Sequence, residues 1–271
     1  MNQDPQPISP AALPTLYVSH GAPLFALAPG NTGPALTQWG AQLRAQHPDL
    51  RGVVVMSPHW MAQGVTVMTG ARPATWHDFG GFPPELYQLQ YPAPGDPALA
   101  GQVLDLLRQA GMDARGDAAR PFDHGAWVPL MHLFPQADLP VVQLALPLGA
   151  GPAEVHALGA ALRGLRAQGV LLAGSGSMTH NLAEFFGGVS EPAPYVLEFS
   201  RWIEQQLERG DLAALLDYRA RAPHARRAHP TEEHFLPLFF ALGAAGAGAH
   251  AEYLSREVMY GMLAMDAFSL G

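Results

Sequence analysis

The stretch Gly52–Trp60 reads Gly-Val-Val-Val-Met-Ser-Pro-His-Trp, an apolar run closed by a proline and a histidine. A short, β-branched apolar run of this kind favours a strand that is buried on both faces. Similar runs recur along the chain, and they predict strands at Thr15–Ser19, Gly52–Ser57, Val65–Thr69, Val141–Leu146 and Val170–Ala173.

Stretches with helical periodicity lie among these strands. In Pro97–Gly111, for example, Leu99, Val103 and Leu106 recur at the spacing of one helix face. The predicted helices are Pro97–Gly111, Pro152–Gln168, Pro194–Arg209 and Thr231–Leu242. Strands that alternate with helices predict an α/β fold, with a central mostly parallel or mixed sheet and helices on both faces. We expect a flexible N-terminus over residues 1–12 and a single domain over residues 13–271.

The composition excludes several classes of chemistry. The chain has no cysteine, which excludes disulfides, thiolate zinc sites and iron–sulfur clusters. All 15 of its basic residues are arginine, so Schiff-base lysines and Gly-Lys-Ser/Thr phosphate loops are excluded too. A net charge of -8 without a basic cluster argues against nucleic acid as a partner. With neither a signal peptide nor a membrane-spanning apolar run, we expect a cytoplasmic protein with no membrane partner.

Three of the 12 histidines follow predicted strands. His20 comes directly after Thr15–Ser19, His59 follows the run that ends at Ser57, and His180 lies a few residues beyond the last strand. Ligands of α/β sheets bind at the carboxyl ends of the strands, so these side chains are placed to converge on one rim. Imidazole is a common metal ligand, and the convergence predicts a metal-dependent active site built from histidines on separate loops.

Two further segments carry histidines in loop-like surroundings. His124 precedes a glycine and a helix-like run, Val128–Phe134. His234 follows Thr231, which we expect to cap a helix whose first turn would contain His234 and keep its imidazole neutral. We expect Glu233 beside it to be a surface residue that the helix dipole favours.

Other conspicuous residues have plainer interpretations. His229 suits a structural role as well as a ligand role, and His77 is an intermediate case. Gly174–Ser177 is expected to be a tight strand-end turn rather than a nucleophile or phosphate loop. Trp60 and Trp127 are expected mainly to pack, with the wall of a substrate pocket as the alternative. The histidines expected at the surface or in ordinary packing are His47, His132, His156, His224 and His250.

Taken in order, five motifs resemble one enzyme family. They are Ser19–Pro23, Ser57–Trp60, Asp123–Leu130, His180–Leu182 and His229–Leu238, and the segments Asp78–Tyr87 and Tyr91–Gly95 fit the same pattern. Together they resemble the class III extradiol ring-cleavage dioxygenases, in particular the branch typified by 4,5-DOPA dioxygenase. The resemblance extends from about Leu13 to Met265.

The resemblance implies one non-haem Fe(II) or Zn(II) ion per chain, held by His20, His59 and His234. It implies that His124 and His180 are the acid–base residues, with His180 a possible fourth ligand. The reaction implied is the opening of a catechol-type, DOPA-like diol by O2, with a small phenolic diol and O2 as the partners. The loop Trp76–Tyr91 and Trp127 would supply the apolar walls.

Two alternatives stay open at this stage. Three histidines and an open position would also activate water in a zinc-dependent hydrolase. A non-catalytic metal-binding relative is the second alternative, and the pair of acid–base histidines argues against it. Neither the exact substrate, nor the native metal, nor the oligomeric state is predicted.

Overall fold

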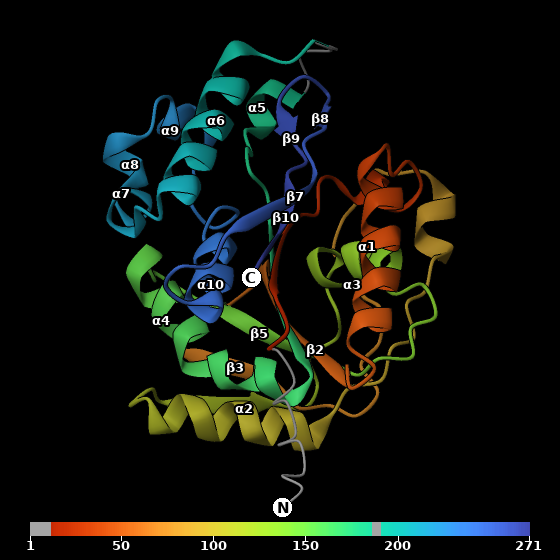
Figure 1. Ribbon diagram of the computed structural model, residues 1–271. Coiled ribbons are helices and arrows are strands. Elements are labelled where there is room, and N and C mark those ends of the chain that lie inside the picture. Colours follow the sequence, from red (N-terminus) through yellow and green to blue (C-terminus); the bar gives the residue numbers. More distant parts are fainter. Residues whose placement is uncertain (1–11, 186–190) are drawn as a thin grey trace, which may run out of the picture.

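The computed structural model describes residues 12–185 and 191–271, so the predicted flexible N-terminus lies outside the described residues apart from Ala12. Its centre is an eight-stranded sheet with the order β4-β3-β5-β2-β6-β1-β10-β7 (Figure 1). The strands are β1 (Thr15–Ser19), β2 (Gly52–Ala62), β3 (Val65–Met68), β4 (Ala114–Asp117), β5 (Val141–Pro147), β6 (Val170–Gly176), β7 (Ala251–Ser255) and β10 (Ala267–Leu270), with a separate hairpin of β8 (Val258–Met259) and β9 (Leu263–Ala264).

The sheet is mixed, with a parallel centre. Strands β5, β2, β6 and β1 run parallel to one another, and the edge pair β3 and β4 is parallel too. Strand β10 pairs antiparallel with β1 and β7, and β3 pairs antiparallel with β5. The mixed sheet confirms the predicted fold class, and the carboxyl ends of β1, β2 and β6 meet along one rim.

Helices cover both faces, as predicted. Helices α1 and α3 lie on one side of the sheet and α4 and α10 on the other (Figure 1). The helices are η1 (Pro23–Ala26), α1 (Thr32–Gln46), η2 (Pro84–Gln88), α2 (Pro97–Gln109), α3 (His124–Leu133), α4 (Pro152–Leu162), η3 (Arg163–Gln168), α5 (Leu182–Phe185), α6 (Pro194–Arg209), α7 (Leu212–Leu216), α8 (Tyr218–Arg221), α9 (Ala225–Ala228) and α10 (Pro237–Ala245), where η marks a 3-10 helix.

The apolar run of β2 explains this arrangement. Successive side chains of a strand point to opposite faces. Val54 and Met56 therefore pack into the core beneath α4 and α10, while Val53 and Val55 pack into the core beneath α1 and α3. All four are buried, which is why the run contains no polar alternation. The two cores flank one sheet within a single domain.

Two predicted boundaries are wrong by five residues or more. Strand β2 continues through His59 to Ala62 instead of ending at Ser57. Helix α10 begins at Pro237 instead of Thr231, because the Thr231 hydroxyl donates to Glu233 Oε1 rather than capping a helix, and Pro237 occupies the first helical turn. None of the described helices is both long and apolar enough to cross a membrane.

A buried carboxyl, Asp266, lies beside the start of β10. Its side chain is mostly shielded from solvent, and it faces Arg256 and Glu204 together with the phenols of Tyr17 and Tyr253. Burial raises the pKa of Asp266 to about 7, with Arg256 opposing the rise. An aspartate in the unfolded chain has a pKa near ~3.9. Stability from this group is therefore present at acid pH and is lost as the pH rises toward 7.

We expect Asp266→Asn to raise the free energy of unfolding by about 2–4 kcal/mol at pH 8, because the neutral amide removes a buried charge. Near pH 4 both side chains are neutral, and the difference between the proteins should disappear. Urea denaturation at the two pH values measures this. An equal effect of the substitution at pH 4 and pH 8 would show that Asp266 is ionised in the folded protein throughout.

Candidate active site

His20 lies directly after β1, at the rim of the sheet. Its side chain is buried, and its Nδ1 lies 3.0 Å from Ser175 Oγ on the neighbouring strand β6. The Ser175 hydroxyl donates to the Gly125 carbonyl, so it accepts a hydrogen bond from His20 Nδ1–H. The lone pair of His20 Nε2 is thereby directed into the site. Sequence reasoning expected Gly174–Ser177 to be a turn, but Ser175 lies within a strand and orients a histidine.

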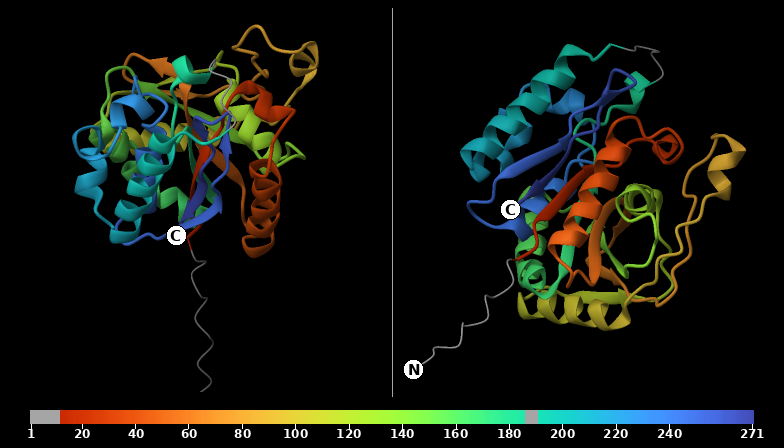
Figure 2. Two further views of the ribbon diagram at one scale, coloured as in Figure 1. Left: turned by 90° about the horizontal axis from the view of Figure 1, so that it is seen from above. Right: turned by 45° about the vertical axis from the view of Figure 1, so that its right-hand side comes forward.

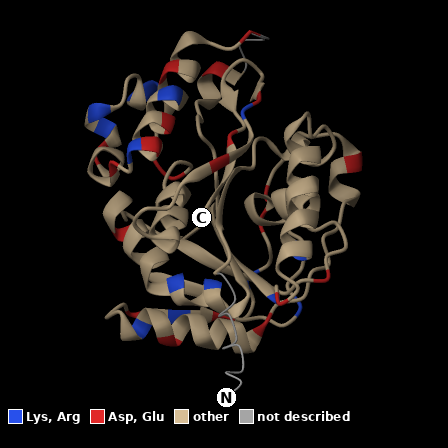
Figure 3. Cartoon of the chain, in the orientation of Figure 1, with Lys and Arg blue, Asp and Glu red and all other residues tan. Residues whose placement is uncertain are grey.

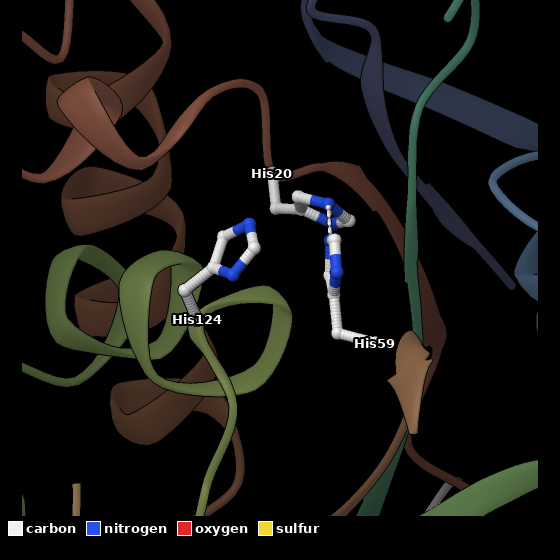
Figure 4. Close-up of side chains that lie close together, drawn as sticks. All are labelled: His20, His59 and His124. Carbon is white, nitrogen blue, oxygen red and sulfur yellow. Dashed lines mark hydrogen bonds between the residues drawn. The ribbon is translucent and has the colours of Figure 1, made fainter. Parts of the chain in front are cut away.

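His59 lies within β2 rather than on a loop beyond it. The pairing of β2 with β5 breaks after Ser57 and resumes at Met61, because Pro58 has no N–H to donate and the strand bulges there. The bulge directs the His59 side chain toward His20, and the two Nε2 atoms lie 3.1 Å apart. Figure 4 shows the two rings meeting above the rim.

His234 reaches the same point from the turn before α10. This turn packs tightly onto β6: the Ser177 amide donates to the His234 carbonyl at 2.7 Å, and a Cβ on Gly176 would lie only 2.3 Å from that carbonyl oxygen. His234 Nε2 lies 3.3 Å from His59 Nε2, and His234 Nδ1 donates to Glu233 Oε1 at 3.1 Å. Glu233 is therefore not the free surface residue that we expected, and its contact with His234 lowers its pKa to about 2.

Gly176→Ala should displace His234, because the added methyl group must push the carbonyl away. We expect a loss of about 1–3 kcal/mol in the free energy of unfolding. The affinity for any ligand held by His234, and the rate of any reaction that depends on it, should fall at least about tenfold. Gly101→Ala on α2 is the matched control, since its Cβ would meet nothing within 4 Å and alanine favours a helix. Equal behaviour of the two variants in urea denaturation would contradict this account of the turn.

The three histidines are neutral at physiological pH. Burial, reinforced by the neighbouring imidazoles, lowers the pKa of His20 and His59 well below the usual value. Burial also lowers the pKa of His234, although Glu233 opposes it. His20 and His234 also donate Nδ1–H to acceptors outside the group, which leaves each Nε2 unprotonated, the form in which imidazole binds metal.

His124 begins α3 and faces the same group. Its backbone amide and its Nδ1 both donate to Asp78 Oδ1, each at 2.9 Å. Its ring centroid lies 3.9 Å from that of His59, and Figure 4 shows His20, His59 and His124 turned toward one another. The hydrogen bond to Asp78 leaves His124 Nε2 free to accept a proton. One ring nitrogen from each of His20, His59 and His124 lies within 4.8 Å of the other two. These three residues therefore form a second possible ligand set.

His180 lies against the ring of His234. The two rings stack with their centroids 3.5 Å apart and their planes within 7°. Burial and the neighbouring His234 lower the pKa of His180 to about 3. Ring nitrogens of His180 and His234 and an oxygen of Glu233 lie within 4.8 Å of one another. The structure thus brings all five predicted histidines together.

Above these histidines lies a cavity of about 420 Å³. His59, His124, His180 and His234 form its polar part. The rest of the wall is apolar or glycine, namely Gly21, Ala22, Pro23, Phe79, Gly80, Gly81, Phe82, Leu182, Phe185 and Leu263. Of the predicted aromatic loop, only the segment 79–82 lines the cavity, and η2 projects away from the body of the molecule (Figure 2). Trp127 lies beneath this wall, fully buried, and donates to the Trp76 carbonyl.

The remaining histidines do not join the group. His229 is buried, and its Nε2 donates to the Met178 carbonyl, so its role is structural. His77 bonds the Leu89 carbonyl, His132 bonds the Phe25 carbonyl, and His224 pairs with Glu198. Sequence reasoning missed Asp78, Ser175 and Glu233 as partners of the site. The only local indication that Asp78 belongs to the site was that it places a carboxylate in the aromatic loop.

Comparison with known proteins agrees with this geometry. Residues 14–266 match the family model described as the catalytic LigB subunit of aromatic ring-opening dioxygenase. The 4,5-DOPA dioxygenase extradiol of Beta vulgaris is 36% identical over 256 residues, covering 94% of this chain and 95% of that one. The protein of the same description from Escherichia coli K12 is 35% identical over 244 residues, covering 88% and 87%.

A solved structure has the same fold. The crystal structure of the uncharacterized protein JW3007 from Escherichia coli K12 superposes with a TM-score of 0.78 at 28% identity, covering 96% of this chain and all of that one. The family model and the relatives each extend over most of the domain that carries the clustered histidines. The chain therefore belongs to the family of the catalytic LigB subunit of aromatic ring-opening dioxygenases.

Proposed function

We propose that the protein is an extradiol dioxygenase that opens the ring of a catechol with O2, using one metal ion held by His20, His59 and His234. The observation that carries the proposal is the convergence of their three Nε2 atoms beneath an apolar cavity. In the overall reaction, the ring bond beside the diol breaks and both atoms of O2 enter the semialdehyde product.

The histidines fit a metal ion. Tetrahedral ligands at metal–nitrogen bonds of about 2.0–2.1 Å lie about 3.3 Å from one another. The Nε2 atoms are 3.1 Å apart for His20 and His59 and 3.3 Å apart for His59 and His234. The short distance between the Nε2 atoms of His234 and His59 favours His234 over His124 as the third ligand. Fe(II), when bound, supplies the redox chemistry that O2 activation requires and that Zn(II) lacks.

His124 is the residue placed to act as a base. Its Nδ1–H is fixed by Asp78, so its Nε2 accepts the proton of a catechol hydroxyl that enters the cavity. The carboxylate of Asp78 then stabilises the imidazolium. Burial alone would raise the pKa of Asp78, but the hydrogen bonds from the ring and backbone of His124 and the electrostatic attraction to that ring outweigh it and lower that pKa. Asp78 therefore stays ionised beside His124.

His180 and the apolar wall complete the site. His180 stays neutral, and its stacking on His234 holds its ring at the cavity, where it can donate or accept one hydrogen bond. Phe79 stands edge-on to His124, with ring centroids 5.6 Å apart. The aromatic wall places a planar ring against the histidines and keeps bulk water from it.

Oxygen uptake distinguishes this proposal from a zinc hydrolase. Protein purified anaerobically and loaded with Fe(II) should consume one O2 per catechol and form a coloured semialdehyde. Ester or amide cleavage without oxygen consumption would favour the hydrolase. The absence of both activities, with metal and catechol bound, would favour a non-catalytic relative.

A further inference from the structure

We propose that this cavity selects catechols whose ring substituent is uncharged and apolar, and that it discriminates against catechols with a carboxylate on the side chain. The inference rests on the proposed function and names its substrate class. It departs from the substrate named in the description of the relatives, since DOPA carries a carboxylate and an ammonium group.

Apart from its histidines, the described part of the cavity wall contains no side chain that could pair with a charged substituent. Over residues 12–185 and 191–271, the only polar side chains that line it are four histidines, which the metal and the diol would occupy. A carboxylate buried against phenyl and aliphatic groups loses its hydration without gaining a hydrogen bond or a counter-ion. In sequence, Phe186–Ser190 contains no ionisable side chain, so that segment cannot provide a cation wherever it lies.

Two arginines that contact residues beside the site, Arg120 and Arg227, are committed elsewhere. Arg120 donates to Asp123 and to the His59 carbonyl, and it packs between Trp60 and Trp76. Neither Arg120 nor Arg227, which pairs with Glu184 at 2.8 Å, lines the cavity. Figure 3 shows basic residues gathered on η3 and on the helices α6–α9.

The apolar wall also orients the ligand. The diol must lie at the histidines, because they are the polar end of the cavity. A ring substituent then extends along the apolar wall, which includes the pair Phe79 and Phe82, with ring centroids 5.4 Å apart, as well as Leu182 and Phe185. A volume of about 420 Å³ falls in the range that encloses ligands well above a bare catechol in size. The cavity therefore has room for an alkyl or aryl substituent.

The test compares two substrates of matched length, 4-propylcatechol and 3-(3,4-dihydroxyphenyl)propanoate. With the Fe(II)-loaded protein we expect kcat/KM to be about 100-fold higher for the neutral compound. Leu182→Arg places a cation at the mouth of the cavity, where Leu182 is 55% exposed, and should narrow this ratio at least tenfold. Leu182→Gln controls for polarity alone. Leu197→Arg, at an exposed site outside the cavity, controls for net charge.

Anaerobic binding separates this inference from the proposed function. Preferential binding of 4-propylcatechol without oxygen uptake would support the apolar selectivity and contradict the dioxygenase. Oxygen uptake with equal or better use of the propanoate would support the dioxygenase and overturn the selectivity. Failure of the protein to bind either catechol would overturn the selectivity as well.

Discussion

His59→Ala should abolish metal binding and lower ring-opening activity at least about a thousandfold, because His59 is the central member of the ligand set. Its Nε2 lies within 3.3 Å of the Nε2 atoms of both His20 and His234. Without His59, the Nε2 atoms of His20 and His234 have no ligand atom between them to complete the set. The measurements are metal content after anaerobic Fe(II) loading and oxygen uptake with a catechol.

His250→Ala is the matched control for that loss. His250 is exposed on the loop before β7, and its two hydrogen bonds with Gly271 are made by the backbone. This variant should keep full metal content and activity. Oxygen uptake that survives in His59→Ala at the level of the control would remove His59 from the metal site.

His124→Gln should lower kcat about 10²–10⁴-fold while leaving the metal in place, because a general base is lost but no ligand. Asp78→Asn should cause a smaller loss of about 10–100-fold, since the base remains but its carboxylate partner does not. Both effects follow from the two hydrogen bonds of 2.9 Å between His124 and Asp78. Single-turnover oxygen uptake and metal analysis on the same samples measure them.

His132→Gln is the control for this pair. It makes the same substitution on the same helix, and glutamine can still donate to the Phe25 carbonyl that His132 contacts. This variant should be nearly as active as the parent. If His124→Gln lost its metal, His124 would be a ligand, and the set of His20, His59 and His124 would replace the one proposed.

Five strands of the fold, β1, β2, β3, β5 and β6, were predictable because each is an apolar run. Thr15–Ser19 and Val141–Pro147 were found within a residue, since burial on both faces leaves no other pattern in the sequence. The antiparallel additions, β7 and β10, were missed. Ala251–Ser255 and Ala267–Leu270 are short and mix small with polar residues. The pairing of β10 with β1, and of β7 with β10, rather than their composition makes them strands.

The convergence of His20, His59 and His180 on one rim was predictable from strand ends, whereas His234 came from the family resemblance. Local signals around Thr231 favoured a helix there, but tight packing of the His234 carbonyl against Gly176 determines the turn. That contact joins residues distant in sequence, as do the bonds from His20 to Ser175 and from His124 to Asp78. Periodicity carries no information about such tertiary partners.

The proposed metal site consists of one ion and the Nε2 atoms of three histidines. The most direct measurement is a crystal structure of protein loaded with Fe(II) without oxygen, with anomalous scattering recorded at the iron edge. The account predicts one peak per chain, within bonding distance of the Nε2 atoms of His20, His59 and His234. A peak bonded to His124 in place of His234, or no peak beside these histidines, would contradict it.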